Sequence, residues 1–353
     1  MSLASQSPGA QTRVLVVDDS AFMRRAIERL LSKMPGVVVV GTAVDGVDGV
    51  RKAIELRPDV ITMDVEMPRM DGVSAVGEIM RTLPTPIVML STLTREGADV
   101  TIRALEAGAV DCVAKPSGLS HELVGVGDRL GEAVRRAHGA NVRKPRPALL
   151  RAPASTAGAT SVRYAGNRLV VIGSSTGGPP ALTEVVPHLP GDLGCPVVVI
   201  QHMPAGFTAA LARRLDALSS LTVVEAAEGD ALSAGKVFVA PGDFHLTVGR
   251  DHRVHLNQEP VMHGVRPAID KTLDSVADLF GRNVSVAILT GMGRDGAAGA
   301  ARVERAGGRV IVQDEATCVV YGMPRAARES TSHAAEAPLE RVADAIVRSV
   351  RAA

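Results

Sequence analysis

Along residues 13–137, short continuous runs of apolar residues alternate with segments in which apolar residues recur at helical spacing. Short runs rich in β-branched residues have the composition of buried strands. They are VLVVDD, VVVVGTA, DVITMD, PIVMLS and DCVAKP. Between these runs the apolar residues recur at helical spacing, as they do from Phe22 to Leu31. Strands that alternate with helices in this way predict a parallel, doubly wound sheet.

A second pattern of the same kind begins at Arg168. Its strand candidates are LVVIG, PVVVIQH, LTVVEA, VFVAPG, VSVAILTG and RVIVQD. Two alternating runs around Gly249–Arg253 predict a β-hairpin, and the last helix is expected at Leu339–Val350. The predicted fold class is α/β, with two doubly wound parallel-sheet domains, of which the second is larger and carries the hairpin.

The stretch between the two patterns differs from both. Residues 138–167 are rich in Pro, Ala, Gly and Ser and show no apolar period, which is typical of a semi-flexible linker. The predicted organisation is therefore a first domain at 12–137, a linker at 138–167 and a second domain at 168–353.

Composition narrows the class of protein. The chain has 353 residues, 46% of them hydrophobic, and a formal net charge of +1, so a general attraction to nucleic acid or to anionic membranes is not expected. Three well-separated cysteines argue against a disulfide framework and for a reducing compartment. The N-terminal residues lack the apolar core of a signal peptide, and the apolar runs are too short for membrane insertion. A cytoplasmic location is expected.

Acidic residues stand at strand ends in the first domain. Asp18 and Asp19 end its first strand, and Asp64 ends its third. The carboxyl ends of parallel strands lie at one edge of the sheet, so three carboxylates are expected to converge there, where Mg²⁺ would relieve their repulsion. Ser91 or Thr92 ends the fourth strand, and Lys115 ends the fifth. A carboxylate, a hydroxyl, an ammonium and a divalent cation can together stabilise an incoming phosphoryl group.

This part of the chain resembles the receiver domain of two-component response regulators, a flavodoxin-like fold. The matching motifs are VLVVDDS, VITMDVEMPRMDG, the Ser91 hydroxyl and VAKP. The resemblance implies that Asp64 accepts the phosphoryl group and that Asp18, Asp19 and Asp64 bind Mg²⁺. It also implies that Lys115 contacts the phosphoryl group and that Ser91 is the switch hydroxyl. Cys112 stands where receivers often carry an aromatic switch residue, so this chain lacks that part of the pattern.

A serine turn opens the second domain. Gly173, Ser175 and Gly177 form a G-x-S-x-G pattern between a strand and a helix, the arrangement that presents a serine nucleophile. By itself the turn is equally consistent with an ordinary glycine-rich βα turn or with a phosphate-binding loop. The P-loop lysine and a G-x-G-x-x-G pattern are missing, which disfavours nucleotide binding. A serine nucleophile needs a base and an orienting acid. His202 follows the next strand, and Asp295 follows a later one.

Neighbouring residues refine this hypothesis. If the strands that carry Ser175, His202 and Asp295 are adjacent, the three side chains meet at one edge of the sheet. Glycines around Met292 leave backbone N–H groups available to an oxyanion. The chain order Ser–His–Asp disfavours an ordinary α/β-hydrolase. His252, His255 and His263 lack metal-ligand spacing and are interpreted as surface residues.

The second domain closely resembles the catalytic domain of chemotaxis protein-glutamate methylesterases. The matching segments include VIGSSTGGPPAL, VVVIQHMPAGFT, AILTGMGRDGAAG and QDEATCVVYGMPRAA. The resemblance implies that Ser175 is the nucleophile, His202 the general base and acid, and Asp295 the orienting carboxylate. Met292 would support the oxyanion and Thr176 would tune the site.

The resemblance also implies a biological role. The activity would be hydrolysis of glutamate γ-methyl esters on methyl-accepting chemoreceptors, together with deamidation of their glutamines, and no cofactor is expected for this reaction. A chemotaxis histidine kinase would supply the phosphoryl group, and phosphorylation of Asp64 would move the receiver away from the active-site edge. The alternative is a non-catalytic response regulator whose second domain binds a signalling partner; no nucleic acid partner is expected.

Overall fold

The computed structural model describes residues 11–115, 120–142 and 168–352. The chain divides into two compact units, with the boundary between Arg146 and Pro147. Most of the predicted linker, residues 143–167, lies outside the described residues, so the predicted domain limits stay predictions.

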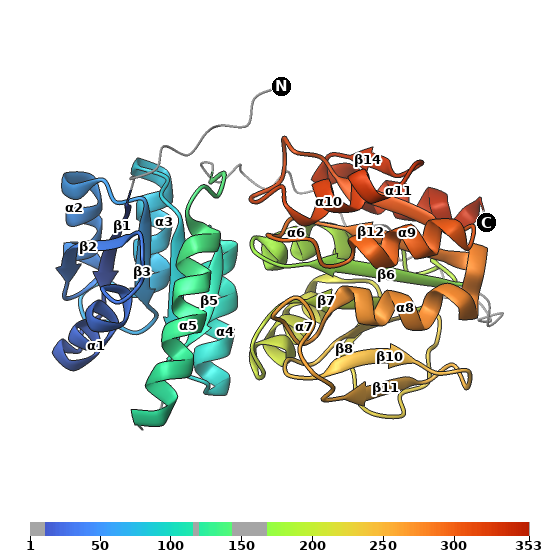
Figure 1. Ribbon diagram of the computed structural model, residues 1–353, viewed down its shortest axis with the longest axis horizontal. Coiled ribbons are helices and arrows are strands. Elements are labelled where there is room, and N and C mark those ends of the chain that lie inside the picture. The colour runs from blue at the N-terminus through green and yellow to red at the C-terminus, as the bar shows by residue number, and fades with distance from the viewer. Residues whose placement is uncertain (1–10, 116–119, 143–167, 353) are drawn as a thin grey trace. The chain divides into compact units, whose positions relative to one another are not determined.

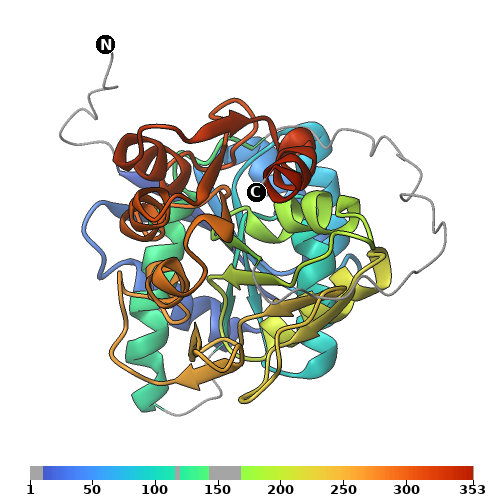
Figure 2. The ribbon, with the colours of Figure 1, turned by 90° about the vertical axis from the view of Figure 1, so that its right-hand side faces the viewer.

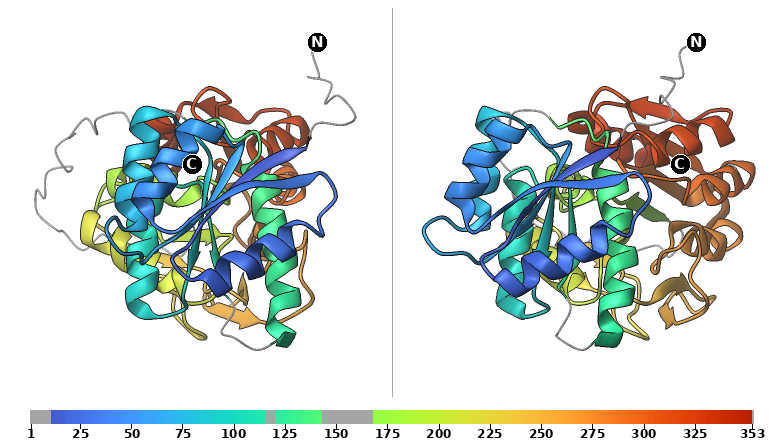
Figure 3. Two further views of the ribbon diagram at one scale, coloured as in Figure 1. Left: turned by 90° about the vertical axis from the view of Figure 1, so that its left-hand side faces the viewer. Right: turned by 60° about the vertical axis from the view of Figure 1, so that its left-hand side comes forward.

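The first unit is a parallel sheet between two layers of helices. Its strands are β1 (Thr12–Val17), β2 (Val37–Ala43), β3 (Val60–Asp64), β4 (Ile87–Ser91) and β5 (Asp111–Ala114). Its helices are α1 (Ala21–Leu31), α2 (Gly46–Leu56), α3 (Gly72–Thr82), α4 (Arg95–Glu106) and α5 (Ser120–Ala137). The strand order β2-β1-β3-β4-β5 is that of flavodoxin-like sheets. Helices α1 and α5 contact each other on one face, and α2, α3 and α4 cover the other (Figure 3).

Local sequence explains where these helices begin. Ser20, Asp45, Asp71 and Thr94 each precede a helix, and each side chain accepts a backbone N–H three residues further on. Such caps satisfy N–H groups that have no partner within the helix. Strands β3 and β4 are buried at every position because helices cover both faces of the sheet.

The second unit is a larger parallel sheet with helices on both faces (Figure 1). Its strands are β6 (Leu169–Ser174), β7 (Val197–Gln201), β8 (Thr222–Glu225), β9 (Lys236–Val239), β12 (Val284–Ile288), β13 (Arg309–Gln313) and β14 (Ala335–Ala337). Strands β10 (His245–Val248) and β11 (Val254–Asn257) pair as an antiparallel hairpin. The order of the large sheet is β14-β13-β12-β6-β7-β9-β8.

Six α-helices flank this sheet in the described residues. They are α6 (Gly178–Val185), α7 (Phe207–Leu218), α8 (Ile269–Phe280), α9 (Ala297–Arg305), α10 (Met323–Ser330) and α11 (Leu339–Arg351). Short 3₁₀ turns follow at η1 (Val186–His188) and η2 (Gly281–Asn283). Helices α8, α9 and α10 contact one another in sequence, while α11 and α7 both contact α6; Figure 2 shows the two groups on opposite faces.

The predicted fold class is confirmed. Both sheets are parallel, the hairpin forms around Gly249–Arg253, and the last helix begins at Leu339 as expected and ends at Arg351. Strand β14 was not predicted, since its three residues AEA contain no apolar run and two of them are exposed. In the described part of the chain, no helix is long and apolar enough to span a bilayer.

Candidate functional site

The candidate catalytic residues of the second unit come from three adjacent strands. Strand β6 lies between β12 and β7, and Ser174 pairs with Gln201 at their carboxyl ends. Ser175 and His202 are therefore the next residues after two neighbouring strand ends. Asp295 lies in the loop between β12 and α9. The adjacency that the sequence prediction required is present.

Tight backbone contacts shape the Ser175 turn. Gly177 has a φ of +75°, which favours glycine, and it is the N-cap residue of helix α6. The Ser175 N–H donates to the Thr290 carbonyl at 3.0 Å, which ties the turn to the segment after β12. A Cβ atom at Gly291 would lie 2.7 Å from the Ser175 Cβ, so this position has no room for a side chain. Ser175 itself is 7% exposed.

Gln201 holds the serine turn against the histidine turn, a contact that the sequence analysis missed. Its buried amide Nε2 donates to the Ser175 carbonyl at 3.0 Å and to the His202 carbonyl at 3.1 Å. Its Oε1 accepts from the Ser174 hydroxyl at 2.7 Å. All polar atoms of this side chain are used between the two turns. A glutamine at the end of an apolar strand was the available signal.

Asp295 orients His202 and receives the end of a helix. His202 Nε2 lies 2.8 Å from Asp295 Oδ2, and because an ionised carboxylate only accepts, Nε2 carries the hydrogen. The backbone N–H groups of Ile269 and Asp270, at the start of α8, donate to the two Asp295 oxygens at 2.7 and 2.9 Å. Helix N-termini favour negative charge.

These contacts determine the ionisation of Asp295. Burial alone would disfavour the charged form. The His202 side chain and the two helix N–H groups outweigh burial and hold the pKa of Asp295 below its ordinary value. Asp295 is therefore ionised at neutral pH and able to stabilise a positive charge on His202.

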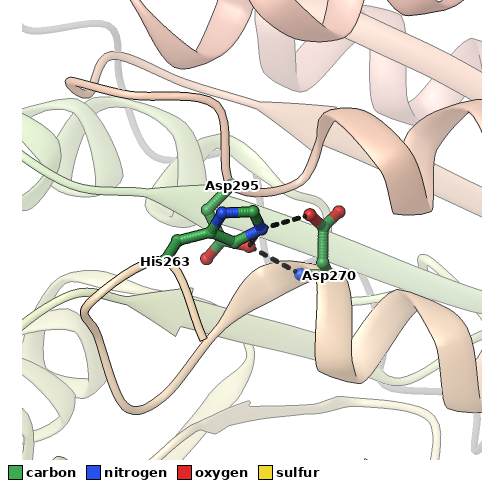
Figure 4. Close-up of side chains that lie close together, drawn as sticks. All are labelled: His263, Asp270 and Asp295. Carbon is green, nitrogen blue, oxygen red and sulfur yellow. Dashed lines mark hydrogen bonds and ion pairs between the residues drawn. The ribbon is translucent and has the colours of Figure 1, made fainter. Parts of the chain in front are cut away.

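His263 is exposed, as its interpretation as a surface residue predicts, but it also contacts this carboxylate cluster. Its Nε2 lies 2.8 Å from Asp270 Oδ2 and 3.8 Å from Asp295 Oδ1 (Figure 4). The spacing of residues along the chain does not indicate this contact, because a turn closed by Met262 and Val265 folds His263 back over the start of α8. His252 lies in the hairpin turn and packs against Phe280, with 5.2 Å between the ring centroids. His255 pairs with exposed acidic residues, as a surface histidine does.

Met292 and Thr176 flank the serine turn. Met292 directly follows Gly291, and its side chain is 47% exposed. Among the described residues, the Met292 backbone N–H has no hydrogen-bond partner. Thr176 is buried, and its carbonyl accepts from the Thr290 hydroxyl at 3.0 Å. The roles of Met292 and Thr176 stay predictions.

The acidic residues of the first unit converge as expected. Carboxylate oxygens of Asp18, Asp19 and Asp64 all lie within 4.8 Å of one another. Lys115 Nζ lies 2.8 Å from Asp18 and 2.7 Å from Asp64. An open cleft of about 560 Å³ at this edge is lined by Asp19, Asp64, Ser91 and Lys115, among others. An all-oxygen cluster beside an open cleft fits Mg²⁺, which keeps several waters when bound.

Burial and charge set the protonation of this pocket. Burial raises the pKa of Asp64, and the neighbouring Asp18 charge adds to that effect against the opposing Lys115 ammonium. Burial disfavours the charged form of Lys115, but its two carboxylate partners outweigh burial and raise its pKa. Lys115 is therefore a fixed positive charge facing Asp64.

Ser91 ends β4 beside this pocket. Its hydroxyl donates to the Gly97 carbonyl at 3.1 Å in α4, so it already contacts the helix that follows the strand. Cys112 is buried in β5 where an aromatic switch residue was considered. The roles of Asp64, Ser91 and Lys115 stay predictions.

Comparisons with known proteins match both units. A family model described as CheB methylesterase matches residues 170–346, and one described as response regulator receiver domain matches residues 14–124. The protein-glutamate methylesterase/protein-glutamine glutaminase of Symbiobacterium thermophilum is 50% identical, over 96% of this chain and 97% of that protein. The Thermotoga maritima protein of the same name is 47% identical, over 90% of this chain and 92% of that protein.

A solved structure is also similar. It is the crystal structure of the Thermotoga maritima CheB methylesterase catalytic domain. The match spans 52% of this chain and 98% of the chain in that structure, at 44% sequence identity and a TM-score of 0.49. With relatives this similar over nearly the whole length, and with a family model matching half of the sequence, the assignment is direct. The chain belongs to the CheB methylesterase family and carries a response regulator receiver domain ahead of its methylesterase domain.

Proposed function

We propose that this chain hydrolyses glutamate γ-methyl esters on methyl-accepting chemoreceptors, and deamidates receptor glutamines, with Ser175 as nucleophile. The observation that carries the proposal is that Ser175 and His202 directly follow the neighbouring strands β6 and β7, and that His202 is hydrogen-bonded to ionised Asp295 in the loop after β12, the other neighbour of β6. The names of the relatives, protein-glutamate methylesterase/protein-glutamine glutaminase, support the same activity.

The first half-reaction is acyl transfer to the serine. Since His202 Nε2 donates to Asp295, Nδ1 is the ring nitrogen free to take the Ser175 hydroxyl proton. The serine oxygen attacks the ester carbonyl, and Asp295 stabilises the imidazolium that forms. His202 then gives its proton to the leaving methoxide, and methanol departs from a glutamyl-enzyme.

The second half-reaction restores the enzyme. Water replaces methanol, and His202 Nδ1 takes a proton from it as the water oxygen attacks the acyl carbonyl. His202 then returns that proton to the Ser175 oxygen as the acyl bond breaks, which releases the glutamate and restores the serine hydroxyl. A glutamine side chain follows the same sequence with ammonia as the leaving group. The free N–H of Met292, beside the serine turn, would donate to the carbonyl oxygen as it becomes negative.

Control would come from the receiver. A chemotaxis histidine kinase would donate a phosphoryl group to Asp64, and Lys115 would neutralise part of its charge. Asp18, Asp19 and Asp64 would hold Mg²⁺, which supplies charge neutralisation during the transfer. The phosphorylated receiver would favour a state in which the active-site edge is accessible, a shift between two populations.

The direct test is product release from chemoreceptors. Purified full-length protein is incubated with methylated receptor, and methanol is measured with and without acetyl phosphate and Mg²⁺. Ammonia release is measured in parallel on unmodified receptor. Methanol release that rises with the phosphodonor supports the proposal, and binding of receptor with no release of either product would contradict it.

Removing the receiver is expected to relieve inhibition. A fragment beginning near Val162 should release methanol at least as fast as unphosphorylated full-length protein, because nothing is left to cover the active-site edge. The measurement is the initial rate at equal enzyme concentration, with phosphorylated full-length protein as the reference. A folded fragment that is markedly slower would contradict inhibition by the receiver.

Gln201→Leu is expected to loosen the two catalytic turns. The change leaves the buried Ser174 hydroxyl and the His202 carbonyl without this partner, while the Ser175 carbonyl keeps only the Gly178 N–H, so the free energy of unfolding should fall by about 1–3 kcal/mol. Methanol release should fall as well, because Ser175 and His202 lose their shared contact. Thermal unfolding and initial rates are compared with Gln258→Leu, a matched change at an exposed glutamine. Equal stability and equal rates in the two variants would contradict the prediction that Gln201 holds the two turns in place.

A further inference from the structure

His263 faces two buried carboxylates from behind the proposed triad. Asp270 and Asp295 are 4% and 2% exposed, whereas the His263 side chain is about one-third exposed. A ring nitrogen of His263 and one carboxylate oxygen from each of Asp270 and Asp295 all lie within 4.8 Å of one another (Figure 4). His202 approaches Asp295 through Oδ2, and His263 lies on the Oδ1 side. One carboxylate is thus placed between two histidines.

Asp270 has no other cation within ion-pairing distance in the described part of the chain. Its Oδ1 accepts the Gly299 N–H at 2.7 Å, and its Oδ2 is paired with His263. Burial and the negative charge of Asp295 raise the pKa of Asp270, so the two carboxylates oppose each other's ionisation. A proton on His263 is the charge that can compensate Asp270.

The backbone supports a specific placement of His263. Its φ is +55°, in the left-handed region that non-glycine residues seldom adopt. The turn is closed by mutual hydrogen bonds between Met262 and Val265. This conformation brings the imidazole to the start of α8, where it meets the only two acidic groups with which it forms ion pairs in the described residues: Asp270 on α8 and Asp295 in the loop before α9.

We propose that His263 and Asp270 form a second histidine–carboxylate pair beside the Asp295–His202 pair. Protonated His263 compensates the negative charge of Asp270. Asp295 therefore stays ionised and interacts with His202 alone. The inference rests on the proposed esterase function. His263 is a positioning residue, since it acts through Asp295 and not on the substrate. Without its charge, the excess negative charge of Asp270 would make Asp295 hold its proton to higher pH.

The test is a double-mutant cycle in full-length protein. Asparagine is the chosen replacement because it tolerates left-handed backbone. His263→Asn should lower kcat/KM at neutral pH by about tenfold and move the acid limb of its pH profile to higher pH. Asp270→Asn alone should move that limb to lower pH, since His263 then faces Asp295 without its partner. The double variant should return close to the wild-type profile.

Several readouts keep the outcomes distinct. His252→Asn is the matched control, because His252 also has a left-handed φ, of +58°, but forms no ion pair in the described residues. A chelator is present throughout, so that no metal ion held by these three side chains contributes. Ester hydrolysis is followed by methanol release, and Ser175 is followed separately by its rate of labelling with a fluorophosphonate.

Two results would overturn the inference. One is a His263→Asn profile that superimposes on that of wild type. The other is a double variant as impaired as His263→Asn, which would mean that packing and not charge is lost. If His263→Asn does not fold, the Asp270→Asn variant alone tests the proposal: the acid limb of its pH profile should move to lower pH, and an unshifted limb would overturn the inference. Wild-type protein that neither releases methanol nor labels at Ser175 would instead contradict the proposed function.

Discussion

Ser175→Ala is expected to abolish methanol release from methylated chemoreceptor, with a loss of about 10⁴-fold or more. The alanine removes the oxygen that forms the acyl bond, and neither His202 nor Asp295 can replace it. The fold should be preserved, because the Ser175 contacts seen in the structure run through its backbone: the N–H to Thr290 and the carbonyl to Gln201 and Gly178. The measurement is initial methanol release, together with thermal unfolding.

A second serine provides the control. Ser219 follows α7, and its buried hydroxyl has no hydrogen-bond partner among the described residues. Ser219→Ala therefore removes a hydroxyl without removing a contact, and its activity should equal that of wild type. A fluorophosphonate should label wild type and Ser219→Ala but not Ser175→Ala. Substantial methanol release by a folded Ser175→Ala protein would end the assignment of Ser175 as nucleophile.

Asp64→Asn is expected to eliminate phosphorylation of the receiver and, with it, activation of the esterase. The amide is a poor nucleophile, and it removes one of the two carboxylates that pair with Lys115. Acetyl phosphate with Mg²⁺ should label wild type and leave Asp64→Asn unlabelled. The phosphodonor should accelerate methanol release by wild type only, while the basal rates of the two proteins should be similar.

The same cleft offers the matched control for this variant. Glu66 lines the cleft but is exposed at its rim, two residues beyond Asp64. Glu66→Gln should be labelled and activated as wild type is. Undiminished labelling of Asp64→Asn would point to another acceptor in the pocket, and unlabelled Asp64→Asn that is still activated would separate activation from phosphorylation.

The sequence predicts the fold class well because strands and helices leave local patterns in the chain. Alternating β-branched runs and helical spacing identify the parallel strands, and functional residues gather where such strands end. Ser175, His202 and Asp64 each stand at or directly after such an end, so the sequence alone is enough to propose them as site residues. Strand β14 was not predicted because this edge strand has only three residues and only one of them, Ala337, is buried, which is too short a segment to show an alternating pattern.

Supporting residues were harder to find for a physical reason. Gln201 connects two turns only because β6 and β7 are neighbours in register, and spacing along the chain does not contain that fact. His263 and Asp270 come together through a left-handed turn and the start of α8. A residue that acts by contact across elements leaves a signal only in three dimensions, whereas a residue at a strand end leaves one in the sequence.

The placement of Asp295 at the start of α8 makes its charge observable without any substrate. The amide protons of Ile269 and Asp270 point directly at the two carboxylate oxygens, so their NMR chemical shifts depend on whether Asp295 is ionised. These two backbone signals report on the electrostatic state of the catalytic acid from a helix that contributes no proposed catalytic side chain. They would allow the resting enzyme to be followed through a pH titration even in variants with no activity.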